Sequence, residues 1–236
     1  MGEEGWTFEA GNGVVPDTML GAKKMHQIYT AAMSDYTGRV TVPVLWDKKQ
    51  HTIVSNESSD IIRMFNIAFD DIGANAVNFS PYQLIKDIDE MNAFIYPNIN
   101  NGVYRAGFAT TQAAYDEAVN DVFKALDRLE SRLTNNRYLL GNAITETDWR
   151  LFTTLVRFDP VYFGHFKCNQ QRIIDYPNLW GYVRDLYQQP GIAETVDIKY
   201  IKAHYYGSHD TINPTRIIPK GPVINFDEPH NRSNIG

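Results

Sequence analysis

The chain has 236 residues, which is enough for one large domain or two small ones. Its hydrophobic content of 43% and its charged content of 21% are those of an ordinary soluble globular protein. The net charge of −6 at pH 7 excludes a basic surface for nucleic acid, and no apolar run approaches the length of a membrane span.

The single cysteine, Cys168, excludes an internal disulfide framework and suits a reducing cytosol. The first residues do not contain a basic segment followed by an apolar one, so they do not have the pattern of a signal peptide. We therefore expect a soluble cytoplasmic protein that binds neither nucleic acid nor a membrane.

The first predicted elements are a short helix within residues 19–33 and a β-hairpin that follows it. Residues rich in Val and Ile lie on both sides of a four-residue turn, residues 47–50, as in a hairpin. Pro43 cannot donate a ladder hydrogen bond and belongs at the start of a strand. A proline in such a place beside a binding site is often cis.

A helix should follow the hairpin, because Ser55, Asn56 and Ser58 supply N-cap chemistry. Its inner face is predicted to consist of Ile61, Ile62, Phe65 and Phe69. Glu57 and Ser58 lie at its N-terminus, where free N–H groups and the helix dipole favour a carboxylate. The pattern fits either an ordinary hairpin with a capped helix or the glutathione-binding half of a thioredoxin-type domain.

From residue 81 onward the apolar periodicity is helical almost throughout. Steps of three and four residues predict helices over residues 85–101 and 115–133, a third from about Thr145, and a fourth over residues 179–187. The second half should therefore be an all-helical body.

A capping signature marks the start of the third of these helices. Thr145 and Asp148 have the spacing of a capping box, with Asp in place of the usual Glu or Gln. Ile144 and Trp149 have the spacing of a hydrophobic staple. The cap residue of such a box stabilises a helix by about 1 kcal/mol.

The last stretch, from residue 207, is rich in Gly, Pro, Asn and Asp. We expect it to be an extended tail that docks on the body or on a partner subunit. The predicted divisions are a partial thioredoxin-like domain over residues 1–80, a helical domain over residues 81–206, and the tail over residues 207–236.

Three short runs, at residues 42–44, 55–58 and 139–148, together resemble the glutathione transferase fold. In that fold an α/β thioredoxin-like N-terminal domain precedes an all-α C-terminal domain. Longer runs narrow the resemblance to the glutathionyl-hydroquinone reductases, the xi class of glutathione transferases. These runs lie at residues 46–49, 53–66, 100–109, 153–162, 190–196 and 211–214.

The resemblance implies a glutathione site formed by Trp6, Arg39, Val40, Thr41, Val42, Glu57 and Ser58. The guanidinium of Arg39 can pair with a carboxylate, and Glu57 can hold the γ-glutamyl ammonium. The resemblance also implies that Tyr104 is a proton donor. Tyr162 and Tyr205 would line a quinol pocket and help to hold a reactive thiolate.

The implied activity is the reduction of glutathionyl-hydroquinones to hydroquinones with release of glutathione disulfide. Glutathione would be the co-substrate, aromatic quinol conjugates the other ligands, and a second copy the partner in a homodimer. The family carries a Cys-Pro-Trp-Ala type motif, upstream of the segment that corresponds to Trp6, whose cysteine attacks the glutathionyl sulfur. This sequence has no such motif, so we expect an incomplete N-terminal domain and a chain that is inactive alone.

Two other functions stay open at this point. One is a truncated or non-catalytic module that binds glutathione and dimerises but lacks the nucleophilic cysteine. The other is a conjugating transferase, whose activating Ser or Tyr would belong to the same missing turn.

Cys168 follows Lys167, whose charge can lower the pKa of a thiol. The resemblance nevertheless places Cys168 on the helical domain, away from the glutathione sulfur, and we expect it to be a bystander. A metal site made by His165, Cys168, His204 and His209 has no standard zinc spacing. We therefore expect no metal.

Overall fold

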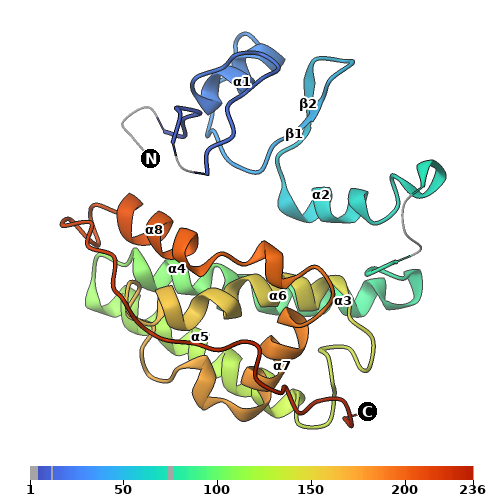
Figure 1. Cartoon of the computed structure of the whole chain (residues 1–236), viewed down its shortest axis with the longest axis vertical. Helices are drawn as coiled ribbons and strands as arrows, with labels where there is room; N and C mark the ends of the chain where they lie inside the picture. Colours follow the sequence, from blue (N-terminus) through green and yellow to red (C-terminus); the bar gives the residue numbers. More distant parts are fainter. Residues whose placement is uncertain (1–4, 12, 74–76, 236) are drawn as a thin grey trace. The chain divides into compact units, whose positions relative to one another are not determined.

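A computed structural model of the chain describes residues 5–11, 13–73 and 77–235. Its contacts divide the chain into two compact units, Met1–Val77 and Asn78–Gly236 (Figure 1). The second unit includes the residues expected to form a tail, so a separate division from residue 207 stays a prediction.

The first unit consists of a helix, a hairpin and a second helix. The hairpin is antiparallel, with Trp46 opposite Ile53 and an irregularity of register beside Leu45. The Asp47 carboxylate closes the turn, because its Oδ1 accepts hydrogen bonds from the backbone N–H groups of the two residues after Lys48 (2.7 and 2.9 Å). The elements are α1 Met25–Ala32, β1 Leu45–Asp47, β2 Thr52–Ser55, α2 Ser58–Phe65 and the 3₁₀ turn η1 Asp70–Ile72.

The hairpin and the cis peptide bond between Val42 and Pro43 are as predicted. The first strand is shorter than the Val-rich run suggests, since residues 39–44 lie before β1. Pro43 explains part of this difference, because it has no N–H group to contribute to a ladder.

The predicted inner face of α2 is wrong in three of its four members. Ile61 is buried, whereas Ile62, Phe65 and Phe69 are 40%, 53% and 43% exposed. The physical reason is the size of the sheet, because a short two-stranded hairpin cannot cover a whole helix face.

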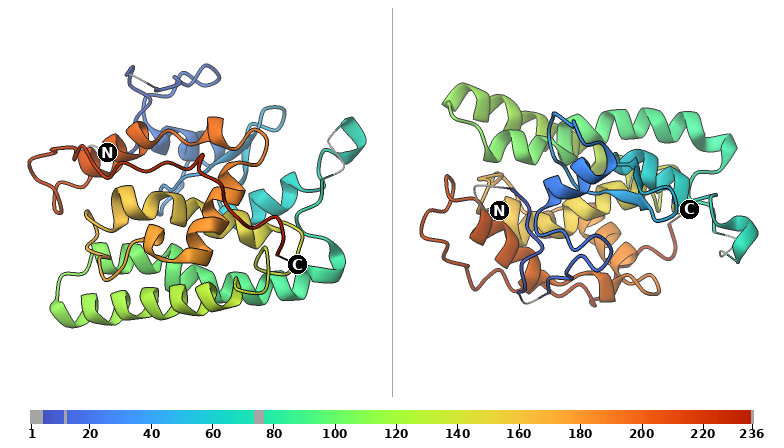
Figure 2. Two further views of the ribbon diagram at one scale, coloured as in Figure 1. Left: turned by 60° about the horizontal axis from the view of Figure 1, so that its bottom comes forward. Right: turned by 90° about the horizontal axis from the view of Figure 1, so that it is seen from above.

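The second unit is helical. Helix α6 contacts both α3 and α7, and α5 packs against α4 and α7, so these helices form one bundle (Figure 2). Every helix in the described parts of the chain is too short or too polar to cross a bilayer. The helices are α3 Ile85–Ile95, α4 Gly102–Gly107, α5 Gln112–Arg132, α6 Glu146–Arg157, α7 Pro177–Tyr187 and α8 Ile198–Ser208.

Shorter turns join the helices. The single helix predicted over residues 85–101 is broken by a π-helical turn that contains Pro97, and the chain then continues as α4. A proline in a helix interior removes one hydrogen bond and clashes with the preceding turn. The turns are η2 Tyr82–Leu84, η3 Tyr96–Asn100, η4 Phe158–Tyr162, η5 Ile173–Asp175 and η6 Ala193–Thr195.

The predicted capping box of α6 is confirmed, and its carboxylate does more than cap. Asp148 is fully buried and accepts hydrogen bonds from the N–H and the hydroxyl of Thr145, both at 2.8 Å. It also accepts from the N–H of Leu139 (2.9 Å) and from the hydroxyl of Tyr182 (2.8 Å). The four bonds tie α6 to α7 and to the loop before α6, and they satisfy a carboxylate that is buried away from the surface.

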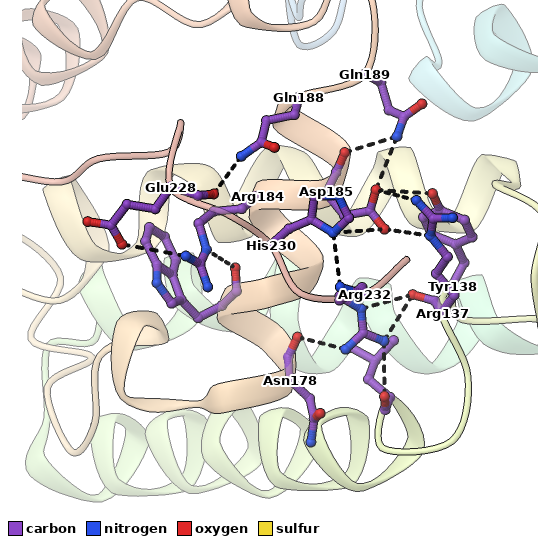
Figure 3. A network of polar contacts seen from close by, with 12 residues as sticks. Arg137, Tyr138, Asn178, Arg184, Asp185, Gln188, Gln189, Glu228, His230 and Arg232 are labelled. Carbon is purple, nitrogen blue, oxygen red and sulfur yellow. Dashed lines mark hydrogen bonds and ion pairs between the residues drawn. The ribbon is translucent and has the colours of Figure 1, made fainter. Parts of the chain in front are cut away.

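The residues after α8 run along the bundle and are held by buried side chains (Figure 1). Phe226 packs between the rings of Trp180 and Tyr187, with centroids 5.5 and 5.0 Å away. Near the end, Arg232 is 2% exposed and lies beside Asn178 and Arg137 (Figure 3). Its guanidinium donates five hydrogen bonds of 2.6–3.4 Å to four main-chain carbonyl oxygens. These belong to Leu133, Asn136, Asn178 and Arg137, the last of which accepts two of the bonds.

Candidate functional site

In the first unit, six of the seven predicted glutathione residues occupy two segments, and Trp6 lies apart from both in the sequence. Residues 39–42 form an extended loop that ends at the cis peptide bond, and Glu57 and Ser58 begin α2. Glu57 is the N-cap residue, and its side chain makes no capping hydrogen bond within the described residues. Its carboxylate is exposed, which leaves it open to an ammonium group.

Side chains of α1 and of the loop after it hold the first of these segments. The hydroxyl of Tyr29 donates to the carbonyl oxygen of Thr41 at 2.8 Å, and that of Tyr36 donates to the carbonyl oxygen of Arg39 at 2.7 Å. The side chains of Arg39, Thr41 and Val42 themselves are exposed. The loop backbone is therefore fixed and Thr41 Oγ1 bonds to Asn56, while the side chains of Arg39 and Val42 are left for a ligand.

Trp6 lies beside the start of α1. Its carbonyl oxygen accepts a hydrogen bond from the N–H of Met25 at 3.0 Å, and Thr7 pairs with Lys24 as an isolated bridge. Trp6 and Val40 are both half-buried.

In the second unit, the three predicted tyrosines meet. Tyr104 comes from α4, Tyr162 from the end of η4 and Tyr205 from α8. The hydroxyls of Tyr162 and Tyr205 are 2.9 Å apart, and the hydroxyls of Tyr104 and Tyr205 form a short hydrogen bond. Tyr205 is thus the centre of a chain of three hydroxyls.

Burial keeps the two inner hydroxyls of this chain protonated. Tyr162 and Tyr205 are only 2% and 7% exposed, and burial raises the pKa of both above the usual range, so both stay protonated. If Tyr162 donates to Tyr205 and Tyr205 donates to Tyr104, both contacts are satisfied. The proton of the half-buried Tyr104 is then left for a bound molecule, and the preceding bonds polarise it.

Aromatic rings surround the three hydroxyls. The ring of Phe166 lies 5.3 Å from that of Tyr104, 5.4 Å from Tyr162 and 6.0 Å from Tyr205. Phe108, which is 45% exposed, stacks on Tyr104 and meets His209 edge to face at 5.1 Å. Flat aromatic surfaces of this kind suit the ring of an aromatic ligand.

The remaining candidates of the second unit do not form a reactive centre. Cys168 is fully buried, and burial raises its pKa to about 12, so the thiol is protonated at neutral pH. His165 Nε2 lies 3.0 Å from His209 Nδ1, so these two rings pair with each other. Within the described residues, no group of three or more His, Cys, Asp or Glu side chains is placed to hold a metal ion.

The roles of several residues of these sites do not emerge from the sequence. Tyr29 gives no signal, because one tyrosine among 14 on a short helix forms no pattern. Asn56 belongs to the N-cap run of residues 55–58, which is the one available hint. Phe166 and His209 depend on contacts between segments more than 40 residues apart.

Comparison with known proteins places the chain in a family. Residues 112–185 match the family model of the glutathione S-transferase C-terminal domain. The chain is 59% identical over 233 residues to glutathionyl-hydroquinone reductase YqjG of Escherichia coli, a match that covers 98% of this chain and 71% of the relative. It belongs to the glutathionyl-hydroquinone reductase family. It is also 54% identical over 223 residues to glutathionyl-hydroquinone reductase PcpF of Sphingobium chlorophenolicum, covering 94% of this chain and 71% of that one.

Solved structures of this family have the same fold. The glutathione-bound structure of YqjG superimposes with a TM-score of 0.94 and covers 97% of this chain and 75% of its own. A xi-class glutathione transferase from Natrialba magadii, 48% identical, gives a TM-score of 0.95 over 98% of this chain and 71% of its own. The predicted family and the glutathione transferase fold are therefore confirmed.

Proposed function

We propose that this protein takes part in the glutathione-dependent reduction of glutathionyl-hydroquinones to hydroquinones, with release of glutathione disulfide. The family supports this reaction, since both bacterial relatives are named for it. The observation that carries the proposal is the meeting of the hydroxyls of Tyr104, Tyr162 and Tyr205 in one aromatic cluster.

The reaction breaks the bond between a glutathione sulfur and an aromatic carbon. A thiolate attacks the sulfur and forms a mixed disulfide, and the electron pair of the broken bond goes to the ring carbon, which takes up a proton. A second glutathione thiolate then attacks the mixed disulfide and releases glutathione disulfide.

The tyrosines suit the protonation step. Tyr104 is at the more exposed end of the hydroxyl chain, and it would give its proton to the ring carbon. The loss of this proton leaves a negative charge on Tyr104. Tyr205 and Tyr162 would stabilise that charge through their hydrogen bonds, which are strong in a buried environment. Phe108 and Phe166 would pack against the quinol ring.

The described residues supply binding and proton transfer, and the attacking thiol is not Cys168. That thiol is buried and protonated, as given above, and its Sγ contacts the carbonyl oxygen of Phe166 at 4.0 Å. A thiolate is the reactive form of cysteine.

The first unit would bind glutathione. Arg39 would pair with a carboxylate, and Glu57 would take the ammonium of the γ-glutamyl residue. Ser58 at the N-terminus of α2 would hold the neighbouring carboxylate. Trp6, Val40, Thr41 and Val42 would complete the site with packing surface and backbone groups.

We also propose that the protein is a homodimer and works in the cytoplasm. The exposed apolar side chains of α2 and the segment after it, among them Phe65 and Ile67 (53% and 64% exposed), favour association with another surface. The single cysteine suits a reducing compartment.

Tyr104→Phe tests the proposal in a chimera that carries the N-terminal segment of YqjG, because this sequence has no Cys-Pro-Trp motif to supply the attacking thiol. Release of hydroquinone from glutathionyl-hydroquinone, measured with excess glutathione, should fall about 100-fold or more when the proton donor is removed. Binding of the conjugate, measured by calorimetry, should weaken by less than about tenfold. Tyr82→Phe, a change at an 89% exposed tyrosine, is the matched control.

Two outcomes would contradict the proposal. Undiminished hydroquinone release by an active Tyr104→Phe protein would remove Tyr104 from the reaction. Glutathione binding without hydroquinone release in the chimera would identify a non-catalytic glutathione-binding module.

A further inference from the structure

One hydroxyl joins three segments of the first unit. The ring of Tyr29 is 2% exposed, and its hydroxyl donates to the carbonyl oxygen of Thr41 at 2.8 Å. The same hydroxyl oxygen accepts from the N–H of Thr41 (3.3 Å) and from Nδ2 of Asn56 (3.1 Å). A tyrosine hydroxyl can donate once and accept twice, so this one is saturated.

Asn56 makes a second hydrogen bond to the same group of residues. Its Nδ2 also donates to Oγ1 of Thr41 at 3.0 Å, so one amide group reaches both Tyr29 and Thr41. Asn56 immediately precedes Glu57, the N-cap residue of α2. The contacts therefore link α1, the loop of residues 39–42 and the start of α2 within one unit.

The link supports a loop that lies outside the hairpin ladder. Residues 39–44 lie outside strand β1, and Pro43 has no N–H group to offer. The N–H and the carbonyl of Thr41 both bond to Tyr29, which takes the place that a neighbouring strand would hold in a sheet. Tyr36 gives a second support, since its ring packs on Tyr29 at 4.9 Å and its hydroxyl bonds to Arg39.

We propose that Tyr29 and Asn56 are positioning residues, which hold residues 39–42 at a fixed spacing from Glu57 and Ser58. The inference rests on the proposed glutathione site, whose two halves are these segments. Neither Tyr29 nor Asn56 needs to touch the ligand. Their effect is preorganisation, because a loop that is already in place loses less freedom when glutathione binds.

Tyr29→Phe tests this role in the full chain, because it keeps the buried ring and removes only the hydroxyl. Glutathione affinity, measured by calorimetry, should weaken about tenfold, since roughly one net hydrogen bond of preorganisation is lost. Asn56→Ala should weaken it by a similar factor. Tyr82→Phe makes the same chemical change at an exposed position and should leave the affinity unchanged.

A double-mutant cycle separates positioning from general stability. If Tyr29 acts through the spacing of the two halves, Tyr29→Phe should cost much less affinity in a Ser58→Ala background than in the wild type. Fully additive losses of affinity would overturn the inference, and so would an unchanged affinity in both Tyr29→Phe and Asn56→Ala.

A second readout does not depend on glutathione. Hydrogen exchange at the amide of Thr41 should accelerate in Tyr29→Phe, because that N–H loses its acceptor. If the wild type does not bind glutathione, the proposed function fails. Faster exchange then still supports the link between the segments, and unchanged exchange overturns it.

Discussion

His165 and His209 stack on Phe166, beside the three tyrosines, and they show how one buried residue can make stability depend on pH. His165 is 5% exposed, and its ring pairs with His209 and packs against Tyr206 at 4.6 Å. Burial lowers the pKa of His165 to about 4, and the positive charges of Lys167 and of a protonated His209 act in the same direction. Burial likewise lowers the pKa of His209. Both rings are therefore neutral in the folded protein at neutral pH.

His165→Gln should flatten the acid side of the stability profile. In the unfolded chain His165 has the ordinary pKa of 6.5, so below that pH the unfolded state binds a proton that the folded state does not. The stability that this residue contributes is complete above pH 6.5 and is lost as the pH falls toward about 4. The loss is on the order of 3 kcal/mol.

Urea titrations at several pH values between 4 and 7 measure this effect. The wild type should lose stability over that range more steeply than His165→Gln. His26→Gln, a change at an exposed histidine, should follow the wild type. Parallel profiles for His165→Gln and the wild type would show that the His165 ring takes up its proton without unfolding.

Among the elements, the close approach of α4 to the segment after η4 sets the shape of the tyrosine cluster. Gly107 ends α4, and a Cβ atom there would lie 2.2 Å from the ring of Phe166. Phe166 packs against all three tyrosines, so any side chain at position 107 must displace the ring on which the cluster rests.

Gly107→Ala should lower the free energy of unfolding by about 1–3 kcal/mol, although alanine is the better helix former. Gly207→Ala is the matched change, since Gly207 lies in α8 and has open space around its Cα. It should raise the stability by about 0.5–1 kcal/mol. Thermal unfolding of the two variants compares them, and a stabilised Gly107→Ala would mean that Phe166 moves aside freely.

Some elements could be predicted from the sequence because local chemistry decides them. The hairpin turn depends on one Asp side chain, and the start of α6 depends on Thr145 and Asp148, three residues apart. Helix α8 is different. Its buried face consists of Ile201, Lys202 and Tyr205, and a lysine in the middle of that face hides the apolar period.

The sites could be predicted only in part, for a related reason. The three tyrosines are 43 to 101 residues apart in pairs, and no local pattern brings them together. Only the resemblance to a family pointed to them. The exposed face of α2 escaped prediction because periodicity reports which residues are apolar and not what covers them.

At the scale of the whole molecule, the two units differ in how they are held together. The main hydrophobic cluster of the described chain, from Ile95 to Phe226, lies entirely in the second unit. The segment after α8 packs against this cluster, and the buried side chains of Lys202 and Arg232 hold it in place. Lys202 is 7% exposed, and its ammonium donates to the carbonyl oxygens of Lys220 (3.0 Å) and Gly221 (2.9 Å).

Arg232→Met should destabilise the second unit by about 2–4 kcal/mol, because it leaves several buried carbonyl groups without donors. Arg216→Met removes an arginine of the same segment that is 63% exposed and paired with Asp210, and it should leave the stability nearly unchanged, because water screens an exposed ion pair. Urea unfolding measures both. Equal effects would show that Arg232 is not the anchor of this segment.

The acceptors of Lys202 and Arg232 are main-chain oxygens, and every residue type provides one. These hydrogen bonds by themselves therefore do not depend on the side chains of residues 133, 136, 137, 178, 220 and 221, provided that the backbone path is kept. Gly181 of α7 is different, because the segment after α8 passes close to it. A Cβ atom at this position would lie 2.8 Å from the carbonyl oxygen of His230. Apart from the aromatic packing of Phe226, the attachment of this segment therefore depends more on the backbone path and on one glycine than on the side chains that surround the two cations.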